Sequence, residues 1–184
     1  MMDTEIIRDP GSLSDGMLAA ELDRLGIPFV DAGDGDRLQR QPAPELLLTA
    51  LATSGEARLR MALIPLFLMR PDFVWPLAQT INDLPGPARV TLMCYYTAAV
   101  LLQRKYTQRL NRLGVAHDEL PHLFDYELGL PPSDVGDDMD ALLVRLAERH
   151  AELSGRPINW RGTYEQAANR FMQRLQQERT WAMS

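Results

Sequence analysis

Two stretches of the chain are apolar on nearly every side of the helix that each could form. Residues 61–69 read MALIPLFLM, and residues 90–102 interrupt an apolar run with only two threonines. A helix without a polar face belongs in the centre of a core. Both stretches are also shorter than the roughly 20 residues that cross a bilayer. We therefore expect two buried helices lying side by side, and no membrane span.

Apolar positions recur with helical spacing from residue 42 onward. The longest helix is predicted over residues 87–113, with one apolar stripe formed by Leu92, Tyr95, Ala99, Leu102, Tyr106, Leu110 and Leu113. Further helices are predicted over residues 14–25, 45–53, 56–70, 73–83, 139–153 and from residue 163, with a short one over residues 121–126. The pattern predicts an all-α fold, a single compact bundle of six or seven helices.

Particular residues predict where these helices begin, end or break. Ser12 or Ser14 can cap the first helix, and Gly26 can stop it. Pro65 cannot donate a backbone hydrogen bond, so we expect a kink or break there. Thr163 and Gln166 have the spacing of a capping box, which predicts the start of the last helix.

The chain is predicted to have three parts. Residues 1–11 are expected to form a flexible tail, residues 12–41 an N-terminal helix followed by a loop or a small hairpin, and residues 42–184 the helical core domain. The hairpin would join the short apolar run 27–30 to residues 37–40 through the turn DAGDGD. We expect this N-terminal element to be attached only loosely to the core.

Composition narrows the class of protein. A chain of 184 residues with 46% apolar residues has the size of one domain with its own core. The net charge of −6 argues against nucleic acid as the default partner. Cys94 is the single cysteine, which excludes an intrachain disulfide and a thiolate zinc site. With no secretory leader visible and eighteen arginines to one lysine, we expect a cytoplasmic, bacterial protein.

Charge is segregated around the longest predicted helix. No acidic residue occurs between positions 84 and 117, whereas eight acids and no Arg or Lys fall between positions 118 and 140. The basic side chains Arg104, Lys105, Arg109 and Arg112 form a candidate partner-binding stripe. Two interpretations stay open: the acidic segment folds back and neutralises the stripe, or the stripe binds an acidic protein or RNA.

One pair of residues resembles the signature of a known family. Arg145 and His150 are separated by four residues, which resembles the Arg-x4–6-His signature of the HEPN family of all-helical bacterial ribonucleases. The resemblance implies metal-independent RNA cleavage by these two residues across a dimer interface. It covers only this pair and the helical character, and Leu146 stands where the family usually has a polar residue. Because positions five apart point about 140° away from each other on a helix, the alternative is a histidine at the edge of the core and a solvated arginine.

A second cluster has the residue types of a metal site. His117, Asp118 and His122 lie together with further carboxylates, and imidazole and carboxylate groups bind divalent metals. This cluster would support a metal-dependent hydrolase. Its spacing fits no HExxH or EF-hand pattern, and acids before Pro121 also suit the start of a helix.

No other segment carries a catalytic signature. The chain lacks GxSxG, CxxC, a phosphate-binding glycine loop and a dinucleotide fingerprint. We therefore favour a non-catalytic helical module that binds a protein partner, such as a regulatory or antitoxin-like subunit. No cofactor is expected, RNA is the less favoured partner, and a homodimer is compatible with the sequence.

Overall fold

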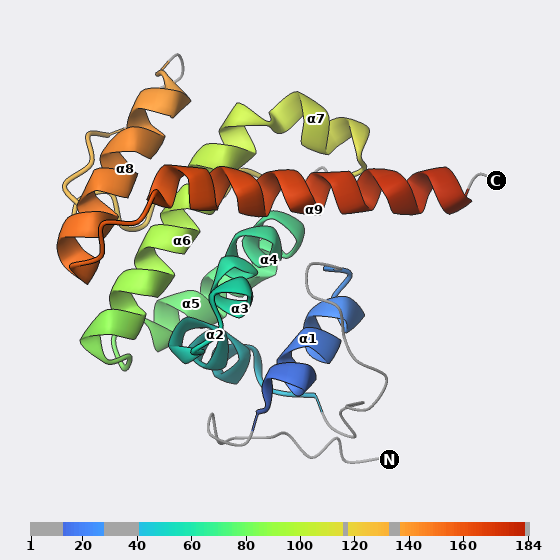
Figure 1. Cartoon of the computed structure of the whole chain (residues 1–184), viewed down its shortest axis with the longest axis horizontal. Coiled ribbons are helices and arrows are strands. Elements are labelled where there is room, and N and C mark those ends of the chain that lie inside the picture. Colours follow the sequence, from blue (N-terminus) through green and yellow to red (C-terminus); the bar gives the residue numbers. More distant parts are fainter. Residues whose placement is uncertain (1–12, 28–40, 116–117, 133–136, 183–184) are drawn as a thin grey trace.

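The structure is a computed structural model that describes residues 13–27, 41–115, 118–132 and 137–182. In these residues the chain is helical and forms a compact bundle without strands, which confirms the predicted all-α fold (Figure 1). The helices are α1 (Asp15–Arg24), α2 (Pro44–Thr53), α3 (Ala57–Met61), α4 (Leu63–Met69), α5 (Val74–Thr80), α6 (Gly86–Lys105), α7 (Thr107–Arg112), α8 (Met139–Ser154) and α9 (Trp160–Ala182), with a 3-10 turn, η2 (Pro71–Phe73), before α5.

The centre of the bundle is the pair α4 and α6, which pack against each other. Every residue of α6 from 92 to 102 is buried, and so is every residue of α4 except Met69. Phe67 on α4 meets Tyr96 on α6 edge to face, with ring centroids 4.9 Å apart. The two apolar stretches of the sequence are therefore the two central helices, as predicted.

The structure contains more helices than expected because two predicted helices are broken. The first break falls at Ala62 and separates α3 from α4, so that Pro65 lies in the first turn of α4, where its missing N–H costs no helical hydrogen bond. The second break falls at Tyr106, whose φ of −106° departs from helical values and separates α6 from α7. Pro65 predicted the first break, and no proline or glycine marks the second.

The first helix packs on the bundle, contrary to the expected loose attachment. α1 contacts α2 and α3, and Leu22 and Ile27 at its C-terminal end are completely buried. Of the two predicted cap residues, Ser14 caps the helix by accepting a hydrogen bond from the Met17 N–H. The helix ends at Arg24, and Gly26 follows its C-cap with a φ of +80°, which favours glycine. The predicted tail and the hairpin turn lie outside the described residues.

Two local predictions are wrong. Residues 121–126 form turns and extended backbone instead of a short helix, and this segment lies on α6 through a hydrogen bond from the Tyr96 hydroxyl to the Pro121 carbonyl. The last helix begins at Trp160, before the predicted capping box. The Asn159 side chain caps it by accepting a hydrogen bond from the Gly162 N–H.

The longest helix, α9, crosses the bundle and contacts α3, α4, α6 and α8. Its C-terminal end reaches past the other helices in Figure 1, and residues 176–182 are all exposed. Among the described residues, no single helix is both long and apolar enough to cross a membrane. Ala57–Met69 and Pro71–Thr80 together reach that length and composition but meet at an angle of 111°.

Candidate functional site

Lys105, in the middle of the predicted partner-binding stripe, is neutralised inside the molecule. Its Nζ atom lies 2.6 Å from Asp140 Oδ1 on α8 and 2.5 Å from Glu165 Oε1 on α9. The second Glu165 oxygen accepts a hydrogen bond from the Tyr106 hydroxyl. Arg161 also pairs with Asp140. This network joins α6, α8 and α9, since Lys105 has one carboxylate partner on α8 and one on α9.

The acidic segment after α7 also turns back toward the stripe. Glu119 Oε2 lies 3.7 Å from Arg104 Nη2, and the Asp118 carbonyl accepts a hydrogen bond from Gln103. Together with Lys105–Asp140, this pairing agrees with the interpretation in which the acids neutralise part of the stripe.

The other two arginines of the stripe have no carboxylate partner among the described residues. Arg109 donates to the neutral Asn169 side chain, and Arg112 donates to the carbonyl of Gln108 in its own helix. Arg179 from α9 joins them by donating to the Arg112 carbonyl. We call Arg109, Arg112 and Arg179 the α7–α9 surface.

The two residues of the ribonuclease-like pair lie in different environments. Arg145 is exposed on the outer side of α8, whereas His150 is buried, with 1% of its surface exposed. The His150 Nδ1 atom lies 2.7 Å from the Tyr164 hydroxyl. Among the described residues no contact brings Arg145 and His150 together, and a meeting across a homodimer stays a prediction.

The candidate metal ligands are described only in part. His117 lies outside the described residues, Asp118 is exposed, and His122 Nδ1 lies 2.8 Å from the Asp125 carboxylate. The part of the chain that the structure describes holds no group of three or more metal-binding side chains. The described contact of His122 is thus an imidazole–carboxylate pair.

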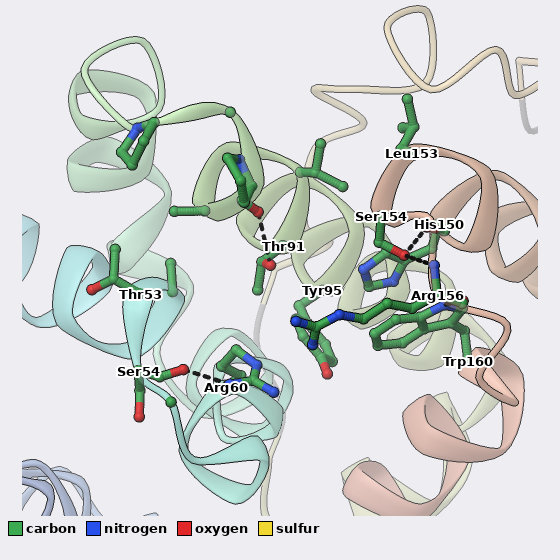
Figure 2. Close-up of a pocket in the computed structure, with 17 residues that line it drawn as sticks. Thr53, Ser54, Arg60, Thr91, Tyr95, His150, Leu153, Ser154, Arg156 and Trp160 are labelled. Carbon is green, nitrogen blue, oxygen red and sulfur yellow. Dashed lines mark hydrogen bonds between the residues drawn. The ribbon is translucent and has the colours of Figure 1, made fainter.

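A cavity of about 840 Å³ opens between the C-terminal ends of α2 and α8 and the N-terminal ends of α6 and α9. Sequence reasoning did not identify it. Figure 2 shows its polar residues, which come from four separate parts of the chain: Thr53, Ser54, Arg60, Thr91, Tyr95, His150, Ser154 and Arg156. Its apolar wall is formed by Ala52, Pro85, Pro87, Ala88, Val90 and Leu153.

Aromatic rings form one end of the cavity. His150 stacks on Trp160 with ring centroids 3.6 Å apart, and Tyr95 meets His150 edge to face at 5.9 Å. Burial lowers the pKa of His150 to about 4, so this imidazole is neutral at pH 7. Burial raises the pKa of Tyr95 to about 12, although the nearby Arg60 charge acts in the opposite direction. Both rings are therefore uncharged.

The formal charges on the cavity wall are those of two arginines. Arg60 Nη1 donates to the Ser54 carbonyl at 2.5 Å, and the Arg156 guanidinium has no hydrogen bond or ion pair with the described residues. In Figure 2 the two side chains extend toward Tyr95 from opposite sides. The described lining contains no Asp or Glu. The wall is thus positive and lacks an internal counter-charge.

One member of this site carried a signal in the sequence. The helical spacing of residues 139–153 places His150 on the apolar face of its helix, where a buried imidazole needs a polar partner. Arg60 and Arg156 are two of eighteen arginines, and nothing in the sequence distinguishes them from the others. Their positions along the chain do not show that they lie near Tyr95, because the three residues meet only when the helices pack.

Comparison with protein-family models, with curated proteins and with solved structures finds no match for this chain.

Proposed function

We propose that the protein is a non-catalytic helical module that binds an acidic region of a protein partner through the α7–α9 surface. The observation that carries this proposal is that Arg109, Arg112 and Arg179 lie where α7 and α9 meet and have no carboxylate partner among the described residues. By contrast, Arg24 pairs with Glu21 and Arg70 pairs with Asp72 elsewhere in the same fold. A partner carboxylate would supply what these three guanidinium groups lack.

The exposed end of α9 supports the same surface. Residues 176–182 bury no side chain, and Trp181 is 79% exposed. A short helical end without packing is marginal in water, and a partner that covers it would stabilise it. Arginine and tryptophan are also enriched in the centres of protein interfaces. The expected regulatory or antitoxin-like role, and the bacterial cytoplasm as its location, belong to this proposal.

The proposal is tested with the full chain and two polyanions. Binding of fluorescent poly-glutamate and of poly(U) RNA is measured at low and at physiological salt, for the wild type and for R109E/R112E/R179E. The control R58E/R145E/R170E has the same net charge, but its changes lie at exposed positions elsewhere.

We expect poly-glutamate binding that weakens with salt and is reduced about tenfold or more by the first triple variant only. Stronger binding of poly(U) than of poly-glutamate would favour RNA as the partner and overturn the choice of a protein. Equal losses in both variants would show that overall charge, and not the α7–α9 surface, is responsible.

A further inference from the structure

We infer that the cavity between α2, α6, α8 and α9 binds a small organic anion, whose carboxylate or phosphate group lies between Arg60 and Arg156 beside the Tyr95 hydroxyl. This site is separate from the α7–α9 surface and shares no residue with it. The inference rests on the charge of the cavity wall, on unpartnered polar atoms of residues that line it, and on the size of the cavity.

The first argument is the charge of the wall. Arg60 and Arg156 line a cavity without acidic residues, and neither makes an ion pair within the described part of the chain. A guanidinium group presents a planar set of N–H donors that matches the oxygens of a carboxylate or a phosphate. The wall is therefore complementary to an anion and unfavourable for a cation.

The second argument is the unpartnered polar atoms at the aromatic end. Tyr95 lines the cavity, and its hydroxyl has no hydrogen-bond partner among the described residues. His150 also lines the cavity, and its contact with Tyr164 through Nδ1 leaves Nε2 without a partner among the same residues. A ligand oxygen placed beside Tyr95 would accept a hydrogen bond from its hydroxyl.

The N-terminus of α6 adds to the positive potential of the cavity. Gly86, Pro87 and Ala88 line the cavity, and this 20-residue helix has no side-chain cap and no acid in its first turn. The first backbone hydrogen bond of the helix runs from the Arg89 N–H to the Pro85 carbonyl. The N–H groups of Gly86 and Ala88 thus stay without a helical acceptor, at the positive end of the helix dipole.

The third argument is size. A volume of about 840 Å³ lies within the range of roughly 300–1,000 Å³ typical of small-molecule sites. It is far larger than an inorganic phosphate needs. Because Val90, Leu153 and two prolines form the apolar wall, the rest of the ligand is expected to be apolar. The class of ligand is thus a small organic acid or phosphate ester with an apolar body.

Trp160 offers a direct readout of the cavity. The chain has three tryptophans, and the other two, Trp75 and Trp181, are 77% and 79% exposed. In the W75F/W181F variant, Trp160 is the only tryptophan, so its fluorescence reports on the cavity. The probes are benzoate, phenyl phosphate, octanoate and inorganic phosphate, and benzamide is the neutral counterpart of benzoate.

We expect benzoate, phenyl phosphate or octanoate to change the Trp160 fluorescence in a saturable way and to bind at least tenfold more tightly than benzamide or inorganic phosphate. R60Q/R156Q should weaken binding about 10- to 100-fold, since hydrogen bonds to charged groups are the strong ones. Y95F should weaken it by a smaller factor. The control R58Q/R145Q removes the same charge at exposed positions and should leave binding unchanged.

Three results would overturn the inference: equal binding of benzoate and benzamide, binding that survives R60Q/R156Q in a variant with an unchanged circular dichroism spectrum, or no saturable change with any of the organic anions at millimolar concentration. Since the α7–α9 variants leave the cavity intact, failure of this site and failure of the proposed protein binding are distinguishable.

Discussion

His150 on α8 lies flat against Trp160 on α9, with ring centroids 3.6 Å apart and an angle of 18° between the ring planes. The stack joins the C-terminal part of one helix to the first residue of the next. The histidine is buried in this stack, and burial favours its neutral form.

This burial predicts a pH-dependent stability. The pKa of His150 is about 4 in the folded protein, against an ordinary value of 6.5 in the unfolded chain. Between these values the unfolded chain binds more protons, so the free energy of unfolding falls as the pH falls through this window. The largest effect is about 3 kcal/mol. Urea denaturation at several pH values measures it.

The matched variant is His150→Phe, which keeps a ring against Trp160 but cannot titrate. We expect its free energy of unfolding to depend less steeply on pH between 6.5 and 4 than that of the wild type. Parallel curves for the two proteins would show that His150 does not contribute to the acid sensitivity.

The neutralised lysine predicts unequal effects of two substitutions. Lys105→Met removes a cation that bonds Asp140 and Glu165, and should lower the free energy of unfolding by about 1–3 kcal/mol. Glu119→Gln removes a carboxylate 3.7 Å from Arg104 on a side chain that is 77% exposed, and should cost less than about 0.5 kcal/mol. Chemical denaturation of both variants is the measurement. Similar losses would contradict a network centred on Lys105.

The hydrogen bond from the Tyr96 hydroxyl is expected to stabilise the segment after α7 on the surface of α6. Tyr96→Phe removes the 2.7 Å hydrogen bond to the Pro121 carbonyl and should lower the free energy of unfolding by about 1–2 kcal/mol. Tyr126→Phe is the control, because Tyr126 is 94% exposed. Thermal denaturation should separate the two variants. If both have the wild-type melting temperature, the hydrogen bond does not stabilise the segment.

The helical framework could be predicted from the sequence because its signals are local. The apolar composition of residues 61–69 and 90–102 predicted the two central helices. Ser14 and Gly26 lie just outside the two ends of α1. The break at Tyr106 could not be predicted, since it depends on packing. Tyr106 bonds Glu165, which lies 59 positions further along the chain.

The cavity could not be predicted for the same physical reason. Its anion-complementary residues are Arg60, Tyr95 and Arg156, and they meet only after α3, α6 and the turn between α8 and α9 have packed. The stripe of Arg104 to Arg112 was visible as a charge pattern, but the pattern did not show that Lys105 would find Asp140 and Glu165. Spacing along a helix predicts faces, and only the tertiary fold decides which charges are left unpaired.

The crossing of α9 over α3, α4, α6 and α8 has a consequence for the order of folding. Tyr164 and Phe171 are completely buried, so they close a core whose other walls come from residues 57 to 154. Until α9 has packed, the faces of α3, α4, α6 and α8 that contact it remain exposed to water. Contacts between residues far apart in the sequence slow folding, compared with a bundle in which each helix packs mainly on the next one along the chain. The core is therefore complete only after α9 has packed against these helices.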